Sequence, residues 1–242
     1  MFVYSELIVT IWLPLNIILK SYFLILRSIS FIAREELRMK KRRIRSIMAT
    51  PIIKTATESD EEGVIDVIMR AFATDPAARW SWPDSQQYFM HFTSFVRAVG
   101  GKAFTKGTAY YVDDGYAAAA LWLPPNVHPD EDKLTSLVQH TVSEQIQKDF
   151  LSVFEQMGHY HPSEPHWFLP FMGVDPFQQG KGFGSALLQH TLTQCDRDSE
   201  LAYLESTNPK NIPLYQRYGF EVLGTIQVGT SPSIFPMLRR PR

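Results

Sequence analysis

The stretch between residues 166 and 190 is the part of the sequence whose residue types and spacing could do chemistry. It reads HWFLPFMGVDPFQQGKGFGSALLQH, an apolar strand pattern followed by a glycine-rich turn and an amphipathic helix pattern. Glycines at 180, 182 and 184 let the backbone approach an anion closely, and the free N–H groups of a first helical turn can bind phosphate oxygens. The segment therefore predicts an anion-binding turn at the start of a helix.

Two common nucleotide-binding motifs do not fit this turn. The Walker pattern needs Ser or Thr after its Gly-Lys pair, whereas Gly182 follows Lys181 here. The dinucleotide fingerprint would need glycine at the position of Ser185. A nucleoside-triphosphate or nicotinamide enzyme is therefore disfavoured.

The turn does resemble the pyrophosphate-binding motif of the GNAT acyl-CoA N-acyltransferases. That motif is Gln or Arg, two residues, Gly, one residue, then Gly or Ala, and it reads Gln179, Gly182, Gly184 here. A downstream segment, STNPKNIPLYQRYGFEVLG, resembles the family's Asn-containing loop and the helix that precedes a Gly-Phe pair. Asn208 and Tyr215 occupy the characteristic positions in that segment.

Further segments are similar to puromycin N-acetyltransferases within this superfamily, namely HPSEP, WFL, GVDP, LEST and YGFEV. The likeness spans about residues 53–242. It implies an enzyme that transfers an acetyl group from acetyl-CoA to a primary amine of a small molecule, by direct attack in a ternary complex. It does not imply that puromycin itself is the acceptor.

The resemblance also assigns roles to residues. In the family, the strand before the turn splays from its neighbour, and its free backbone groups bind the pantetheine arm of CoA. Tyr215 is expected near the CoA sulfur as the acid, because a phenol with a pKa near 10 is protonated at neutral pH. The residues expected to bind acyl-CoA are Met172, Gly173, Val174, Gln179, Gly180, Lys181, Gly182, Phe183, Gly184, Ser185 and Asn208.

Pro170 departs from a regular strand, because proline has no N–H to donate, so we expect a bulge or an edge there. The general base stays open, since residues 167–174 contain no carboxylate where some relatives place one. Water-mediated deprotonation is an equal alternative to the side-chain candidates, which are Asp75, His161, Glu164 and His166. Three aromatic residues could line an acceptor pocket or belong to the core: Trp80, Trp82 and Tyr88.

The order of patterns after Met48 predicts an α/β (α+β) domain with the GNAT fold. We expect a mixed central sheet of about six to seven strands, splayed at the acyl-CoA site, with helices on both faces. A capping box is expected from Ser59 to Glu62. The expected helices are 60–73, 84–99 (stopped by two glycines), 129–157 (broken once), 182–196 and 212–218. The expected strands are 52–53, 108–112, 117–123, 167–174, 201–206, 220–228 and 234–238.

Composition limits the partners. The 24 basic and 25 acidic residues give a formal net charge of -1, which provides no overall attraction to nucleic acid. Cys195 is the only cysteine, so no intramolecular disulfide can form, and no metal site is expected. Its position inside a predicted helix disfavours an acyl-cysteine intermediate. These features favour a cytoplasmic protein, monomeric or homodimeric.

Residues 1–47 differ from the rest, being apolar at first and basic from 39 to 45. The apolar run from Leu7 to Leu19 is shorter than the roughly 20 residues of a membrane span and contains Pro14. A signal peptide carries its positive charge before the apolar run, not after it. We therefore expect an extension outside the mature enzyme or a poorly ordered leader, with membrane association not favoured, and an acetyltransferase domain over 48–242.

Two other functions stay open from the sequence alone. The acceptor could be a peptide or protein amine, or the domain could be a non-catalytic acyl-CoA sensor.

Overall fold

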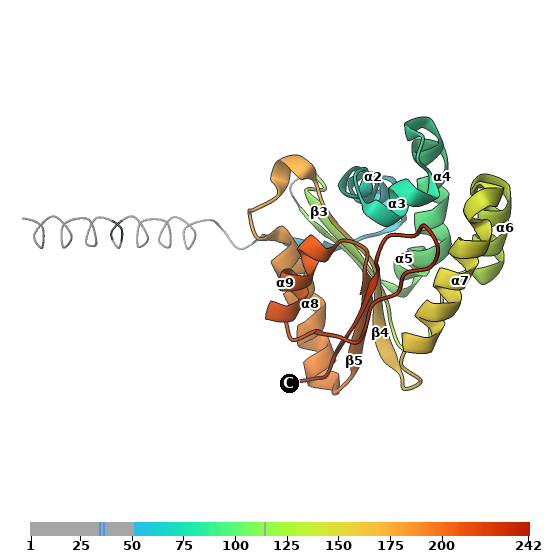
Figure 1. Ribbon diagram of the computed structural model, residues 1–242. Coiled ribbons are helices and arrows are strands. Elements are labelled where there is room, and N and C mark those ends of the chain that lie inside the picture. Colours follow the sequence, from blue (N-terminus) through green and yellow to red (C-terminus); the bar gives the residue numbers. More distant parts are fainter. Residues whose placement is uncertain (1–33, 35, 37–50, 114) are drawn as a thin grey trace, which may run out of the picture. The chain divides into compact units, whose positions relative to one another are not determined.

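The computed structural model describes residues 34, 36, 51–113 and 115–242. Residues 51–242 form one compact unit (Figure 1). Apart from residues 34 and 36, the segment 1–47 lies outside the described part of the chain, and so does the prediction about it. Within the described part, no helix has the length and apolar character needed to cross a bilayer.

A single mixed sheet of seven strands organises this unit, in the order β1-β2-β3-β4-β5-β7-β6. Only β4 and β5 pair in parallel among these strands, and all other neighbours are antiparallel. The predicted mixed sheet of six to seven strands is confirmed. The strands are β1 (Ile53–Thr55), β2 (Ala109–Val112), β3 (Ala118–Leu123), β4 (His166–Val174), β5 (Leu201–Ser206), β6 (Glu221–Val222) and β7 (Phe235–Arg239).

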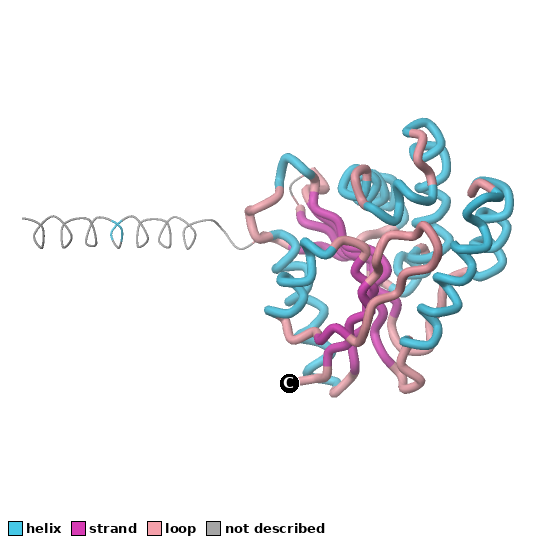
Figure 2. Tube along the Cα trace, viewed as in Figure 1, coloured by secondary structure: helices cyan, strands magenta, loops and turns pink. Residues whose placement is uncertain are grey.

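Helices cover both faces of the sheet, as expected (Figure 2). One face carries α2 (Glu61–Phe72), α3 (Pro76–Ser81), α4 (Ser85–Gly100), α5 (Lys102–Lys106), α6 (Glu131–Thr141) and α7 (Glu144–Tyr160). The other face carries α8 (Phe183–Asp198) and α9 (Ile212–Arg217). Single 3-10 turns are formed by η1 (Glu58–Asp60), η2 (Pro176–Gln178) and η3 (Pro209–Asn211).

Strand β3 shows why the sheet is buried on both faces. All six of its residues are buried, as expected for a central strand whose sequence, AAALWL, is continuously apolar. Successive side chains point to opposite faces. Leu121 and Leu123 therefore join the core under α2 and α4, while Trp122 joins the core under α8.

Two short helices were not predicted. Asp75 accepts hydrogen bonds from the backbone N–H groups of Ala77 and Ala78, and Pro76 occupies the first helical position, where its missing N–H costs nothing. A polar segment expected to end α2 thus starts α3. The predicted stop at the two glycines is confirmed, since α4 ends at Gly100 with Gly101 as its C-cap. The second unpredicted helix, α5, follows directly and is closed by Gly107 with a φ of 66°.

The expected strand over 220–228 is wrong in length. Only Glu221–Val222 pairs with β7, and Ile226 makes an isolated bridge to Ile234. The apolar side chains that suggested a longer strand serve a small separate core instead, where Ile226, Ile234 and Val153 are buried together. This loop therefore packs on α7 and not on the sheet edge.

The predicted capping box is also wrong in position. Asp60, not Glu62, accepts from the Thr57 backbone N–H at 2.9 Å, and the hydroxyls of Tyr111 and Tyr116 donate to its other oxygen. These bonds lower the pKa of Asp60 to about 2 from an ordinary 3.8, with the Thr57 backbone as the largest cause. One carboxylate thus ties the start of α2 to the β2–β3 hairpin.

Replacing Asp60 with Asn tests this tie. A carboxyl whose pKa is lowered on folding stabilises the protein at pH values above its pKa in the unfolded chain. The stability lost by removing this carboxylate should therefore be greatest above about pH 5 and should vanish as the pH falls toward about 2. We expect Asp60→Asn to melt below the wild type at pH 7, with the two converging in acid. Asp66→Asn, on the exposed side of α2, is the matched control and should melt like the wild type throughout. A constant difference across pH would contradict the assignment.

Candidate active site

The parallel strands β4 and β5 pair at only three positions and then part. Their register runs His166–Leu201, Trp167–Ala202 and Phe168–Tyr203, after which no pairing between them continues in the described sheet. β5 remains fully paired with β7 on its other side, and β4 remains paired with β3. The sheet is therefore split down its middle, and residues 169–174 have no β5 partner on that side, where the Val174 carbonyl accepts from Gln179 Nε2 at 3.5 Å.

A bulge at Leu169 and Pro170 accompanies the split. Between the pairs Leu121–Phe171 and Leu123–Phe168, β3 contributes one residue and β4 contributes two. Phe168 and Phe171 therefore face the same core although they are three residues apart. The irregularity expected from the missing N–H of Pro170 is confirmed, and it reverses the inward and outward alternation for the rest of β4.

The segment after β4 is held in place by Asp175. Its backbone N–H bonds the Ala117 carbonyl at 3.0 Å, and its side chain accepts from the Phe177 N–H at 2.9 Å and from Arg70 Nε at 3.1 Å. The carboxylate thus connects the end of β4, η2 and α2. Because α8 begins eight residues later, these contacts position the glycine-rich turn relative to the split.

The turn itself has the backbone geometry that an anion site needs. Gly180 and Gly182 have φ values of 78° and 90°, a region that L side chains rarely adopt. Gly182 is the N-cap of α8, and its carbonyl accepts the N–H of Ala186, the first bond of the helix. The N–H groups of residues 183–185 precede that bond, and residues 179–182 are exposed. An incoming phosphate can therefore reach them from solvent.

The structure brings most of the predicted acyl-CoA residues to this region. Met172, Gly173 and Val174 lie on β4 beyond the split, and residues 179–185 form the turn and the first turn of α8. Asn208 is different, because its Oδ1 accepts the Lys210 N–H at 3.1 Å and caps η3. It is not among the residues that line the neighbouring cavity.

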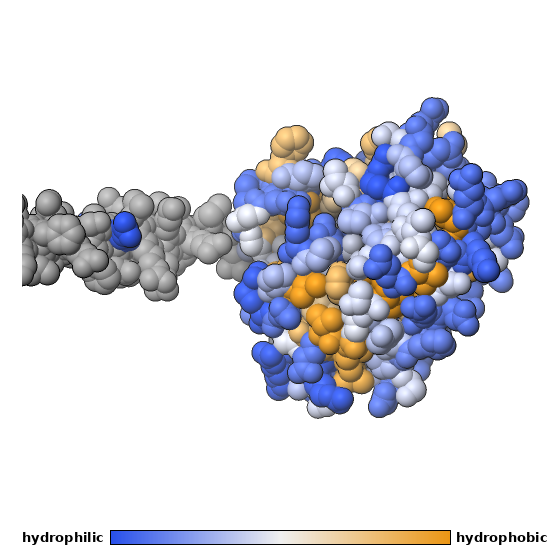
Figure 3. Space-filling model, viewed as in Figure 1, coloured by the Kyte–Doolittle hydropathy of each residue, from blue (hydrophilic) through white to orange (hydrophobic). Residues whose placement is uncertain are grey.

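A cavity of about 580 Å³ extends from the split between β4 and β5 toward α3, α4, α6 and α7. At the split it is lined by residues of both strands, including Met172, Glu205 and Thr207, and by Tyr215. Its remaining walls are mainly apolar and aromatic. Apolar side chains reach the surface in a band between α9 and α7 (Figure 3).

Tyr215 lines the end of this cavity that borders the split between β4 and β5. It is 7% exposed, and burial, together with the charge of Asp75, raises the pKa of its hydroxyl well above the ordinary value. The phenol is therefore protonated at neutral pH. Asp75 is itself held by Ala77, Ala78 and the Thr207 hydroxyl, the last at 2.6 Å, which fixes α3 to the loop after β5.

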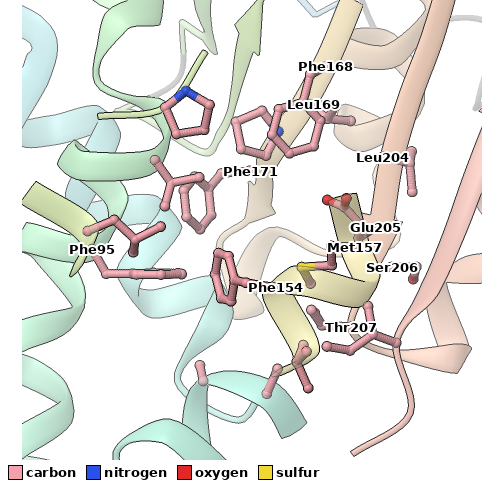
Figure 4. Close-up of a pocket in the computed structure, with 18 of the residues that line it drawn as sticks. Phe95, Phe154, Met157, Phe168, Leu169, Phe171, Leu204, Glu205, Ser206 and Thr207 are labelled. Carbon is pink, nitrogen blue, oxygen red and sulfur yellow. The ribbon is translucent and has the colours of Figure 1, made fainter. Parts of the chain in front are cut away.

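Glu205 is a functional candidate that the sequence analysis missed. Because side chains alternate along β5, Glu205 points to the sheet face opposite that of its neighbour Leu204. It lies on the face covered by α7, where its side chain is only 9% exposed. Figure 4 shows its carboxylate directed into the cavity beside Met157. Burial raises the pKa of this carboxyl to about 8, against a smaller opposing effect of Tyr203. An acidic residue inside an otherwise apolar strand, LAYLES, was the signal that could have found it.

The predicted base candidates lie in different surroundings, and not all of them line the cavity. His161 and His166 line the cavity, and His161 Nδ1 lies 3.8 Å from Glu205 Oε1. Burial and the neighbouring histidines lower the pKa of His161 to about 4, so its ring is neutral at pH 7. Glu164 is exposed outside the cavity lining, and the Asp75 carboxylate is engaged in three hydrogen bonds.

Two of the three aromatic residues predicted for the acceptor pocket line the cavity, and the third does not. Trp80 and Trp82 line the cavity, whereas Tyr88 does not and donates its hydroxyl to the Met69 carbonyl in the core. Cys195 is fully buried in α8 outside the cavity lining, and burial raises the pKa of its thiol to about 12. The described residues include no cluster of three or more His, Cys, Asp or Glu that could hold a metal ion.

Comparison with known proteins agrees with this geometry. The family model of the acetyltransferase (GNAT) family matches residues 141–220, which include the split, the turn and Tyr215. Residues 141–220 thus carry the match to a GNAT acetyltransferase domain. An uncharacterized N-acetyltransferase of Schizosaccharomyces pombe is 23% identical over 205 residues, covering 78% of this chain and 83% of that protein.

Solved GNAT structures share the fold. One described as histone acetyltransferase HPA2 and related acetyltransferase, from Corynebacterium glutamicum, aligns with a TM-score of 0.58 and 25% identity over 80% of this chain and 97% of that one. Arylalkylamine N-acetyltransferase 2 from Aedes aegypti aligns with a TM-score of 0.55 and 15% identity over 79% and 99%. GNAT enzymes use acetyl-CoA, and the split and the exposed glycine turn fit its pantetheine and pyrophosphate groups.

The glycine turn can be tested with Gly182→Ala. No atom lies within 4 Å of the added Cβ, so the substitution acts only through the positive φ. We expect it to lower the free energy of unfolding by about 1 kcal/mol and the melting temperature by roughly 2–4 °C. Gly107→Ala is a matched control, because Gly107 also has a positive φ and open space but ends α5. Both variants should lose similar stability, and only Gly182→Ala should weaken CoA binding in calorimetry. Equal CoA affinities would argue against the turn as the pyrophosphate site.

Proposed function

We propose that the domain acetylates a primary amine of a small molecule by direct attack of the amine on the acetyl-CoA thioester. The observation that carries this proposal is the continuous cavity that joins the split between β4 and β5 to Tyr215 and Glu205. Acetyl-CoA supplies the activated acyl group, and Met172, Gly173, Val174 and the turn at 179–185 would hold it. The likeness to puromycin N-acetyltransferases remains a prediction about the subgroup.

The two ionisable side chains suit the two proton transfers of this reaction. An alkylammonium must lose a proton before its nitrogen attacks, and Glu205, with a pKa near 8, is closer in basicity to such an amine than an ordinary carboxylate is. As the carbon–sulfur bond breaks, the leaving thiolate needs a proton, and the Tyr215 hydroxyl can donate it. The N–H of Val174 would serve the oxyanion, because it points away from β3, whereas Gly173 lies in a hydrogen-bonded pair with Ala119.

Direct attack is favoured over a covalent relay. The one cysteine of the chain is buried away from the cavity with a raised thiol pKa, so it offers no thiolate to accept the acetyl group. A ternary complex of both substrates therefore accounts for the cavity better than a ping-pong scheme.

The alternatives have different support. A peptide or protein acceptor would need an open groove, and the enclosing walls from α3, α4, α6 and α7 favour a smaller molecule. The likeness to the Corynebacterium glutamicum protein, which is described as a histone acetyltransferase, keeps a histone-type acceptor in the test panel. A non-catalytic acyl-CoA sensor would have no need of a buried carboxylate and a buried phenol in one cavity.

Tyr215→Phe tests the acid. Removing only the hydroxyl should lower kcat by roughly 10²–10³-fold while CoA affinity changes little, because the ring still packs. Free-thiol release from acetyl-CoA with a panel of amines measures kcat, and calorimetry measures CoA binding. Tyr218→Phe, in the same helix-end segment, is the control and should keep wild-type turnover. An unchanged kcat in Tyr215→Phe would remove the tyrosine from the mechanism.

Glu205→Gln tests the base. Because only the carboxylate can accept the proton, kcat/KM of the wild type should rise with pH through about 8. In the variant this rise should disappear, and kcat/KM above about pH 8 should be lower by about 10²-fold or more. Tyr203 and His161 face the same carboxyl; Tyr203 stays protonated and His161 stays neutral in this range, so neither accounts for the rise. A retained rise would indicate that water deprotonates the amine.

A further inference from the structure

The acceptor side of the cavity is built largely from aromatic rings. Trp80 stacks on Phe150 with ring centroids 6.0 Å apart, and Phe150 stacks on Phe154 at 4.9 Å. Phe95 meets Phe171 edge to face at 5.8 Å. Figure 4 shows Phe95, Phe154 and Phe171 gathered around the open space. Such walls offer dispersion and ring-stacking contacts to a flat apolar group.

Apart from Tyr215, the ionisable side chains that line the cavity are carboxyls and imidazoles. Neither lysine nor arginine is among the described residues that line it. Its basic side chains are imidazoles, and His161, the one nearest Glu205, is neutral at pH 7 because burial lowers its pKa to about 4. Its carboxylates are Asp75, Glu131 and Glu205. Of these, Asp75 is engaged by Thr207 and α3, and Glu131 is exposed.

These walls and charges discriminate between kinds of amine. The amine must approach Glu205 for its proton to be removed. A carboxylate on the carbon next to that amine would be buried beside Glu205 with no lysine or arginine to pair with it, and an unpaired buried anion is costly. An aromatic body attached to the amine would instead replace water against the rings of Phe150 and Phe154.

Resting on the proposed acetyltransferase function, we infer that the acceptor is a primary amine carried on an aromatic body that bears no carboxylate or phosphate. Free amino acids and acidic peptides are excluded because their carboxylates would find no lysine or arginine in the cavity lining. Small aliphatic amines lack the group that the rings would contact.

Matched ligands test this inference by binding to the full chain in calorimetry. Phenethylamine and phenylalanine differ by one carboxylate, and phenethylamine and butylamine differ by the ring. We expect phenethylamine to bind at least ten-fold more tightly than either. Equal or tighter binding of phenylalanine or butylamine, or no binding of phenethylamine, would overturn the inference.

Variants assign the preference to the cavity. Phe154→Ala should weaken phenethylamine binding by about ten-fold, while Phe177→Ala, a control at a residue that is 93% exposed outside the cavity lining, should not change it. Above about pH 8, where Glu205 is ionised, Glu205→Gln should reduce the difference in affinity between phenethylamine and phenylalanine. Circular dichroism checks that each variant is folded. If Phe154→Ala and Phe177→Ala bind phenethylamine equally, the aromatic wall is not the acceptor site.

A thiol-release assay with acetyl-CoA separates this inference from the proposed function. Tight binding of phenethylamine with no thiol release from any amine would overturn the acetyltransferase function and leave the ligand class supported. Thiol release with butylamine or phenylalanine preferred over phenethylamine would overturn the acceptor class and leave the acetyltransferase function supported.

Discussion

The parting of β4 from β5 is the constraint on which the rest of the structure depends. Parallel strands normally continue their ladder, since every unpaired backbone group in a sheet interior costs free energy. Here the extra residue at the bulge and the missing N–H of Pro170 interrupt the ladder just where the two strands separate. The unpaired groups that remain are left for a bound molecule, and the cavity opens where a continuous sheet would have been solid.

The split also explains why polar chemistry survives inside an apolar fold. In a closed sheet, the position of Glu205 would face packed side chains, and a carboxylate there would be strongly destabilising. Facing a cavity instead, the group persists, and its burial is expressed as a pKa near 8. Tyr215 is treated similarly at the end of α9, where burial keeps the hydroxyl protonated. Burial beside the cavity thus raises the pKa of both groups.

Sequence patterns predicted the parts of the fold that rest on local chemistry. The buried strands, the glycine turn and the irregularity at Pro170 follow from residue type, and all were found. Errors arose where a contact distant in sequence decided the outcome. The 220–228 segment leaves the sheet after Val222, because Ile226 packs with Val153 and Ile234. Glu205 was missed because its significance depends on which face of β5 borders the cavity.

The short ladder between β4 and β5 has a mechanical consequence. Three residue pairs connect these strands, whereas five connect β5 to β7. The sheet therefore consists of two parts, β1-β2-β3-β4 and β5-β7-β6, joined by the short β4–β5 ladder. Near the point where these strands separate, the Thr207 hydroxyl donates to Asp75. Bending along such a short ladder breaks few backbone hydrogen bonds. Each part of the sheet could therefore keep its own pairing and packing if the angle between the two parts changed.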